Sequence, residues 1–95
     1  MAAYVIFIRE RVRNQAAIES YKKMAPAGMA GFPVKVHAAY GRKEVLEGPE
    51  VEGVVILEFP TFEEAQNWYH SPQYQAAAEH RFLGADYRAI IVQGL

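Results

Sequence analysis

The chain has 95 residues, of which 52% are hydrophobic, 13% aromatic and 22% charged, a composition that excludes a disordered or low-complexity protein. Ten basic and eleven acidic side chains give a net charge of −1, so no overall field attracts nucleic acid or an anionic membrane. There is no cysteine, which excludes disulfides and thiolate chemistry and agrees with an expected cytoplasmic location. The length predicts one domain over residues 1–95.

The N-terminal part of the chain predicts a strand and a helix. Residues 4–8 are aromatic and β-branched, which is typical of a strand, and the run is far shorter than a membrane span. Asn14 is placed to cap a helix whose apolar residues recur at three- and four-residue intervals up to Ala25. Pro26 strains this helix, which ends at Gly28, Gly31 and Pro33 or first takes one more kinked turn through Met29.

A second strand is expected over residues 34–40, where polar and apolar residues alternate. Val34, Val36, Ala38 and Tyr40 should share its better-buried side. Gly41 interrupts the alternation before residues 42–47, which again look extended. This pattern favours one long strand bent at Gly41, with a tight hairpin at Gly41 as the alternative.

The third predicted strand, residues 54–59, is apolar without alternation. Such a strand should be covered on both faces. It should also run antiparallel to the strand before it, because the connecting turn is too short for a crossover.

Two helix starts follow the third strand. Thr61 and Glu64 form a capping box, which predicts a helix that ends near residue 70. Ser71 and the proline after it start a second helical segment, which Gly84 closes. Residues 87–92 then predict the last strand, again apolar on both sides.

The order strand, helix, strand, strand, helix, strand predicts an α+β, ferredoxin-like βαββαβ fold with a four-stranded antiparallel sheet and its helices on one face. A chain of this size cannot cover the other face. At about 25 cal/mol per Å², several hundred Å² of apolar surface contribute several kcal/mol toward pairing, before association entropy is subtracted. We therefore expect a homodimer formed through the open sheet face.

Several motifs are distinctive in combination: VLEG at 45–48, VILEFP at 55–60, residues 65–69, SPQYQ at 71–75, Arg81 and VQG at 92–94. Together they resemble the domain-of-unknown-function 1330 (DUF1330) family of the dimeric α/β-barrel superfamily. The resemblance implies a ferredoxin-like domain paired as a dimeric α/β barrel, and it implies no general activity. The chain departs from the family's pattern at residues 31–33 and 37–39, where GFP and HAA replace a Gly-Gly pair and an Arg-Gly-Gly. Ligand identity is therefore not carried over from relatives.

Two residues are weak candidates for catalysis. Glu58 follows four aliphatic residues, and a buried carboxylate needs a partner or a raised pKa. Arg81, on the apolar stripe of the last helix, is the predicted partner, and a purely structural ion pair is the alternative. His37 is a candidate general base or pocket-lining group, because histidine titrates near neutral pH.

Tyr21, Tyr69 and Tyr74 occupy inner helical positions, where a ring can pack and a hydroxyl still needs a partner. They could line the mouth of a pocket or simply fill the core. The predicted ligand-binding residues of a cleft between sheet and helices are Tyr21, His37, Glu58, Tyr69, Tyr74 and Arg81.

No cofactor or metal site is predicted. His37, His70 and His80 lack metal-ligand spacing, and phosphate-loop and dinucleotide fingerprints are absent. The aliphatic third strand differs from the base-stacking strand of RNA-recognition domains, so neither nucleic acid nor membrane is an expected partner. We predict binding of a small, partly apolar molecule, and the resemblance adds cofactor-independent oxygenation or isomerisation as a candidate activity. The alternative is a non-catalytic dimer without a ligand.

Overall fold

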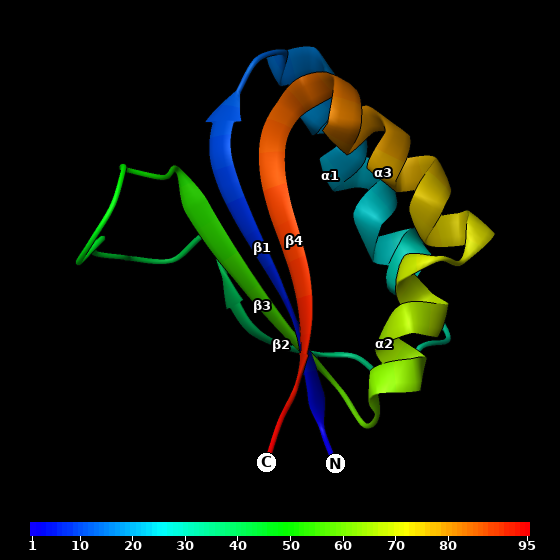
Figure 1. Ribbon diagram of the computed structural model, residues 1–95. Helices are drawn as coiled ribbons and strands as arrows, with labels where there is room; N and C mark the ends of the chain where they lie inside the picture. Colours follow the sequence, from blue (N-terminus) through cyan, green and yellow to red (C-terminus); the bar gives the residue numbers. More distant parts are fainter.

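The computed structural model describes residues 1–95, and it shows a four-stranded antiparallel sheet with three helices on one face (Figure 1). The strands are β1 (Ala3–Val12), β2 (Lys35–Ala39), β3 (Gly53–Phe59) and β4 (Ala85–Gln93), in the order β2-β3-β1-β4. The helices are α1 (Gln15–Met29), α2 (Phe62–Tyr69) and α3 (Pro72–Gly84). This is the predicted ferredoxin-like arrangement. None of the helices is long and apolar enough to cross a membrane.

The three predicted helix starts are confirmed. The side chains of Asn14, Thr61 and Ser71 each accept a hydrogen bond from the backbone N–H three residues later, at 3.1–3.2 Å. The capping box is only half formed, because Glu64 Oε2 is buried without a hydrogen-bond partner. Pro26 lies inside α1, so the helix takes the longer of its two predicted forms.

The second strand is shorter than predicted, and neither a bent strand nor a hairpin at Gly41 is present. β2 ends at Ala39, and Tyr40 turns the chain with a φ of 59°. The Tyr40 ring lies against Gly53, where any Cβ would overlap it. Residues 41–52 form an irregular loop that projects on the side of the sheet away from the helices (Figure 1). A tyrosine packed across β3, and not a glycine, sets the turn.

A bulge in β2 changes which side chains share a face. Val36 lies opposite Leu57 and Ala38 lies opposite Ile56, so His37 is the extra residue between them. One added residue moves every later side chain to the other face of a strand. Val36 therefore faces the helices and Ala38 faces away, which means that their predicted shared side is wrong.

Side chains of the other three strands alternate between the helix-covered face and the open face. On the covered face, Val5, Phe7 and Phe59 are buried and meet Trp68 and Tyr74 from the helices. The open face carries a second set of apolar side chains, none of them fully buried: Ile6, Ile8, Val54, Ile56, Ile90 and Val92. A single chain leaves this apolar face without a cover.

Two glycines let α1 approach α3 closely. A Cβ on Gly28 would lie 3.2 Å from the Cα of Tyr74, and one on Gly84 would lie 2.8 Å from the side chain of Ile18. Because α1 is held against α3, it does not lie flat on β2 and β3. A cavity remains between α1 and the sheet.

Candidate functional site

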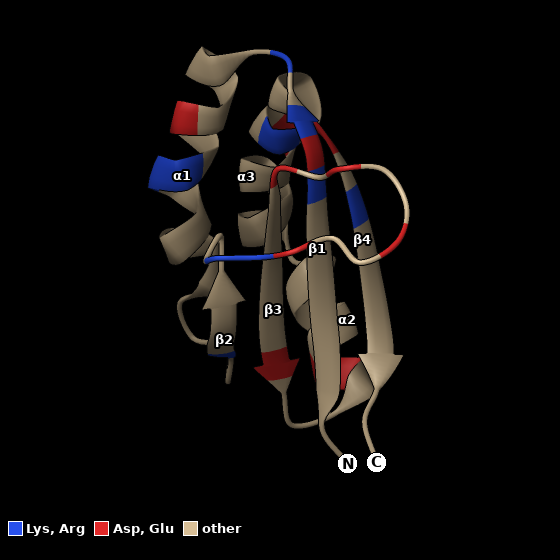
Figure 2. Cartoon of the chain, turned by 90° about the vertical axis from the view of Figure 1, so that its left-hand side faces the viewer, with Lys and Arg blue, Asp and Glu red and all other residues tan.

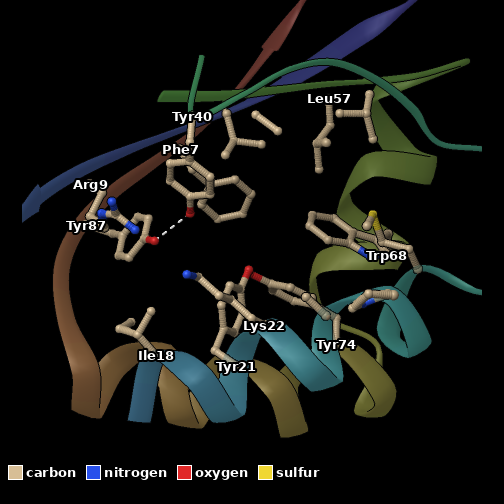
Figure 3. Close-up of a pocket in the computed structure, with 16 residues that line it drawn as sticks. Phe7, Arg9, Ile18, Tyr21, Lys22, Tyr40, Leu57, Trp68, Tyr74 and Tyr87 are labelled. Atoms are coloured by element: carbon tan, nitrogen blue, oxygen red, sulfur yellow. Dashed lines mark hydrogen bonds between the residues drawn. The ribbon is translucent and has the colours of Figure 1, made fainter. Parts of the chain in front are cut away.

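A cleft of about 230 Å³ lies between α1 and the helix-covered face of the sheet (Figure 3). Side chains from α1, including Tyr21 and Ala25, form one wall, and Val36, Val55 and Leu57 from the sheet form the other. Thirteen of its 16 lining residues are hydrophobic, so a molecule held there must be largely apolar.

The polar groups of the cleft gather at one end. The Tyr40 and Tyr87 hydroxyls are 2.6 Å apart, and the Arg9 guanidinium lies 4.6 Å from the centre of the Tyr40 ring. Arg9 Nε also lies 3.3 Å from Glu52 Oε1. Figure 3 shows Lys22 reaching into the cleft from α1 near this end, while Leu57 and Trp68 lie at the other. The cleft therefore has one polar end and one apolar end.

A second pair of tyrosines joins α1 to α3. The Tyr21 and Tyr74 hydroxyls are 3.0 Å apart, and their rings meet edge to face at 82°. Both side chains line the cleft. Either hydroxyl can donate to the other, so the pair keeps one free proton for a ligand acceptor.

Burial raises the pKa of Tyr21, Tyr40 and Tyr74 above the ordinary tyrosine value of 10.0. The neighbouring hydroxyl raises the pKa of Tyr21 and Tyr40 further, whereas the charge of Arg81 opposes part of the rise in the pKa of Tyr74. At neutral pH all three are uncharged. They can orient a ligand by hydrogen bonds, but they are poor bases.

These raised pKa values predict a loss of stability in alkali. A tyrosine whose pKa is higher in the folded state stabilises the fold fully below pH 10.0 and loses that contribution as the pH rises toward the folded value. We expect the urea-unfolding free energy to fall above pH 10, and tyrosinate absorbance to appear at higher pH in folded than in unfolded protein. The variant Y21F/Y74F should narrow this difference. Identical titrations of folded and unfolded protein would contradict the burial of these hydroxyls.

The structure distributes the six predicted site residues over three places. They are the cleft (Tyr21 and Tyr74), a groove between β4 and the helices (Tyr69 and Arg81), and the open sheet face (His37 and Glu58).

The predicted pairing of Glu58 with Arg81 is wrong. Glu58 Oε1 bonds to His37 Nε2 at 2.6 Å, and the Tyr4 ring lies beside His37 with its centre 6.3 Å away. Tyr4 and Glu58 are opposite each other in β1 and β3, on the open face. Arg81 belongs to α3, which covers the other face, so the sheet separates it from the carboxylate.

Arg81 lies among aromatic rings. Its side chain is 3% exposed, and its guanidinium carbon lies 4.9–5.0 Å from the ring centres of Phe7, Phe82 and Tyr87. Each ring attracts the cation through its face. Arg81 and Tyr69 line a groove that is separate from the cleft but shares Tyr87 as a wall.

Sequence reasoning missed four polar residues of the cleft, namely Arg9, Lys22, Tyr40 and Tyr87. Arg9 had a usable signal, since it follows Val5 and Phe7 at two-residue spacing and so shares their face. The other three depend on where β2 ends and how α1 is rotated, which the pattern of residues does not give.

The antiparallel sheet in the order β2-β3-β1-β4, with all helices on one face, defines a ferredoxin-like fold. The chain belongs to the family described as Domain of unknown function (DUF1330), whose family model matches residues 2–95. A comparison with curated proteins gives no match.

Three solved structures illustrate the likeness. A protein of unknown function from Rhodopseudomonas palustris is 20% identical with a TM-score of 0.78, over 99% of this chain and 82% of that one. A dimeric ferredoxin-like protein of unknown function from Bacteroides fragilis is 13% identical with a TM-score of 0.65, over 98% and 96%. SnoaB, a cofactor-independent oxygenase from Streptomyces nogalater, is 11% identical with a TM-score of 0.60, over 99% and 92%. At these identities the likeness establishes the fold.

Proposed function

We propose that the protein binds a small, largely apolar molecule in the cleft between α1 and the sheet. The observation that carries this proposal is a cleft of about 230 Å³ with apolar walls and hydroxyl groups at defined positions. In another protein an apolar cavity of about 150 Å³ is enough to bind benzene. A substituted aromatic compound or a compact lactone is therefore a suitable occupant.

The two ends of the cleft suggest how such a ligand is oriented. Its apolar body would lie against Trp68 and Leu57, and a hydrogen-bond acceptor would point toward Lys22 and the Tyr40–Tyr87 pair. A few placed polar groups in an apolar pocket are what fixes ligand orientation.

A second candidate function is cofactor-independent oxygenation or isomerisation, which the fold likeness to SnoaB favours. Such chemistry starts by removing a proton from the substrate. No carboxylate or imidazole lines the cleft, and its three raised-pKa tyrosines are neutral at neutral pH. No group that lines the cleft is therefore placed to accept that proton, which weighs against this candidate. A catalytic role of His37 or Glu58 remains a prediction, and it would need a substrate on the open face.

We also propose a homodimer that covers the open sheet face. Ile90 and Val92 are each 45% exposed on this face, and Leu46 on the projecting loop is 83% exposed. Figure 2 shows that most Lys, Arg, Asp and Glu residues lie toward the strand ends and in the loop, while Arg88, opposite Ile8, is a charged residue that lies further inside β4 on this face. A second copy offers the same apolar surface, as an isologous contact requires. A non-catalytic dimer without a ligand is the alternative function, and a cytoplasmic location remains a prediction.

Filling the cleft should abolish binding. We expect A25L, which adds bulk to the α1 wall, to remove the rise in melting temperature caused by neutral compounds such as naphthol or coumarin. A ligand at 100 times its dissociation constant stabilises the native state by about 2.7 kcal/mol, which is several degrees of melting temperature for a domain of this size. The matched control is A27L on the exposed side of the same helix.

The melting temperatures of A25L and A27L distinguish a protein that binds a ligand in the cleft from a dimer without a ligand. If an added compound raises the melting temperature of A27L but not that of A25L, the compound binds in the cleft. No shift in unaltered protein across a broad panel of small aromatics, lactones and acids favours the dimer without a ligand.

A further inference from the structure

Arg81 is a buried cation without an anionic partner. Arg81 is only 3% exposed, and no carboxylate oxygen lies within 4.0 Å of its guanidinium nitrogens. Its Nε is buried without a hydrogen-bond partner. The faces of the three surrounding rings attract the charge, and the nearby Tyr74 hydroxyl, whose pKa burial raises and the guanidinium partly lowers, is a neutral partner, so no anion balances Arg81. A buried donor left unpaired costs about 1–3 kcal/mol, and more when it is charged.

The carboxylate of the surrounding groove is already committed to other cations. Asp86 Oδ2 accepts a hydrogen bond from Arg11 Nε at 2.8 Å, and Asp86 Oδ1 accepts one from Arg13 Nε at 2.8 Å. These two bonds hold the pKa of Asp86 below its ordinary range. Arg13 also donates to the backbone carbonyl of Phe82 at 2.7 Å, which fixes its position. The charge of Arg81 therefore stays uncompensated within the groove.

The groove has the shape and walls of a binding site. Its volume is about 440 Å³, within the usual range of ligand pockets, and it lies between β4 and the adjoining parts of α2 and α3. Tyr69, Phe82 and Tyr87 supply aromatic walls, and Ala85 and Ala89 of β4 leave room between them. It is open to solvent on the side of the sheet that the proposed dimer leaves free, since these β4 residues alternate with those of the open face.

We propose that this groove binds a small carboxylate with a flat, apolar body, and that Arg81 holds the carboxylate group. The planar guanidinium presents N–H donors in a fork that matches the two oxygens of a carboxylate. The aromatic walls favour a flat body such as a benzene ring. A phosphate is a poorer fit, because a dianion would meet one uncompensated cation and the carboxylate of Asp86 at the same time.

Benzoate is the probe that tests the site on unaltered protein, with benzamide as a control of the same shape and no charge. We expect benzoate to shift the NMR amide signals of Ala85, Tyr87 and Ala89, and benzamide to bind at least tenfold more weakly. Equal binding of the two compounds would overturn the assignment of Arg81 as an anion-binding residue, and so would tighter binding of inorganic phosphate. No amide shift with benzoate at millimolar concentration would overturn the site itself.

Variants separate this groove from the cleft. R81Q should reduce benzoate affinity at least tenfold. R81K keeps the positive charge but lacks the paired N–H donors of a guanidinium, so its benzoate affinity should lie between those of R81Q and the unaltered protein. K23Q, on the exposed side of α1, is the matched charge control. A25L should bind benzoate normally, because it fills only the cleft. If A25L abolishes benzoate binding while R81Q leaves it intact, the carboxylate binds in the cleft and the groove proposal is wrong.

Discussion

Replacing Trp68 with alanine is expected to lower the free energy of unfolding by about 3–5 kcal/mol, the usual cost of removing a buried aromatic side chain. Trp68 is 1% exposed and lies at the centre of the core. Its ring centre lies 4.2 Å from that of Tyr74 and 5.3 Å from that of Phe59. Its removal therefore opens a cavity where the helices meet the sheet, and it also strips one wall from the cleft.

The loss is a large part of the total stability, which for a small domain is about 5–15 kcal/mol. We expect the melting temperature of W68A to fall by more than about 10 °C, measured by circular dichroism at fixed protein concentration. W68F is the matched control. It keeps most of the ring and removes an indole N–H that has no hydrogen-bond partner, so its cost should be much smaller. A loss below about 1 kcal/mol for W68A would show that Trp68 is not a core residue.

Placing a charge in the middle of the open sheet face should convert the proposed dimer into a monomer. Ile56 of β3 lies opposite Ile6 of β1 and Ala38 of β2, so it is surrounded by apolar side chains. In I56D a face-to-face dimer would bury two unpaired carboxylates, at a cost of several kcal/mol each. Association would be lost at any practical protein concentration.

Native mass spectrometry of untagged protein measures this directly and detects a retained ligand at the same time. We expect a dimer for the unaltered chain, a monomer for I56D, and a dimer for A76D, which adds the same charge to an exposed position of α3. A dimer that persists in I56D would place the interface elsewhere. A monomeric unaltered protein would remove the argument from the apolar open face.

The elements of the fold could be predicted because their signals are local. The helices are capped by Asn14, Thr61 and Ser71, each through a hydrogen bond to a backbone N–H only three residues later. The apolar run over residues 54–59 likewise indicates a strand without reference to the rest of the chain. The expectation of an uncovered apolar face needed only the element order and the length of the chain. Neither inference depends on how distant side chains meet.

The candidate site could be predicted only in part, because it depends on side-chain direction across the sheet. The bulge at His37 moves the end of β2 by one residue, and no residue pattern gives its position. The expected partner of Arg81 was a carboxylate, since ion pairing is the usual solution for a buried cation, whereas Phe7, Phe82 and Tyr87 surround it instead. The alternating pattern predicts that the strand continues through Tyr40, whereas packing of the Tyr40 ring against Gly53 turns the chain there.

Because side chains alternate along β1, β3 and β4, the residues that shape the cavities and the residues that shape the open face occupy different positions, odd-numbered and even-numbered, of the same strands. Odd-numbered residues such as Phe7, Leu57 and Tyr87 meet the helices and the cavities, whereas even-numbered ones such as Ile6 and Ile56 meet the open face. A laboratory selection for a new ligand should therefore collect its substitutions at odd positions of these strands. A selection for a new partner subunit should collect them at even positions, so each property can change while the other is kept.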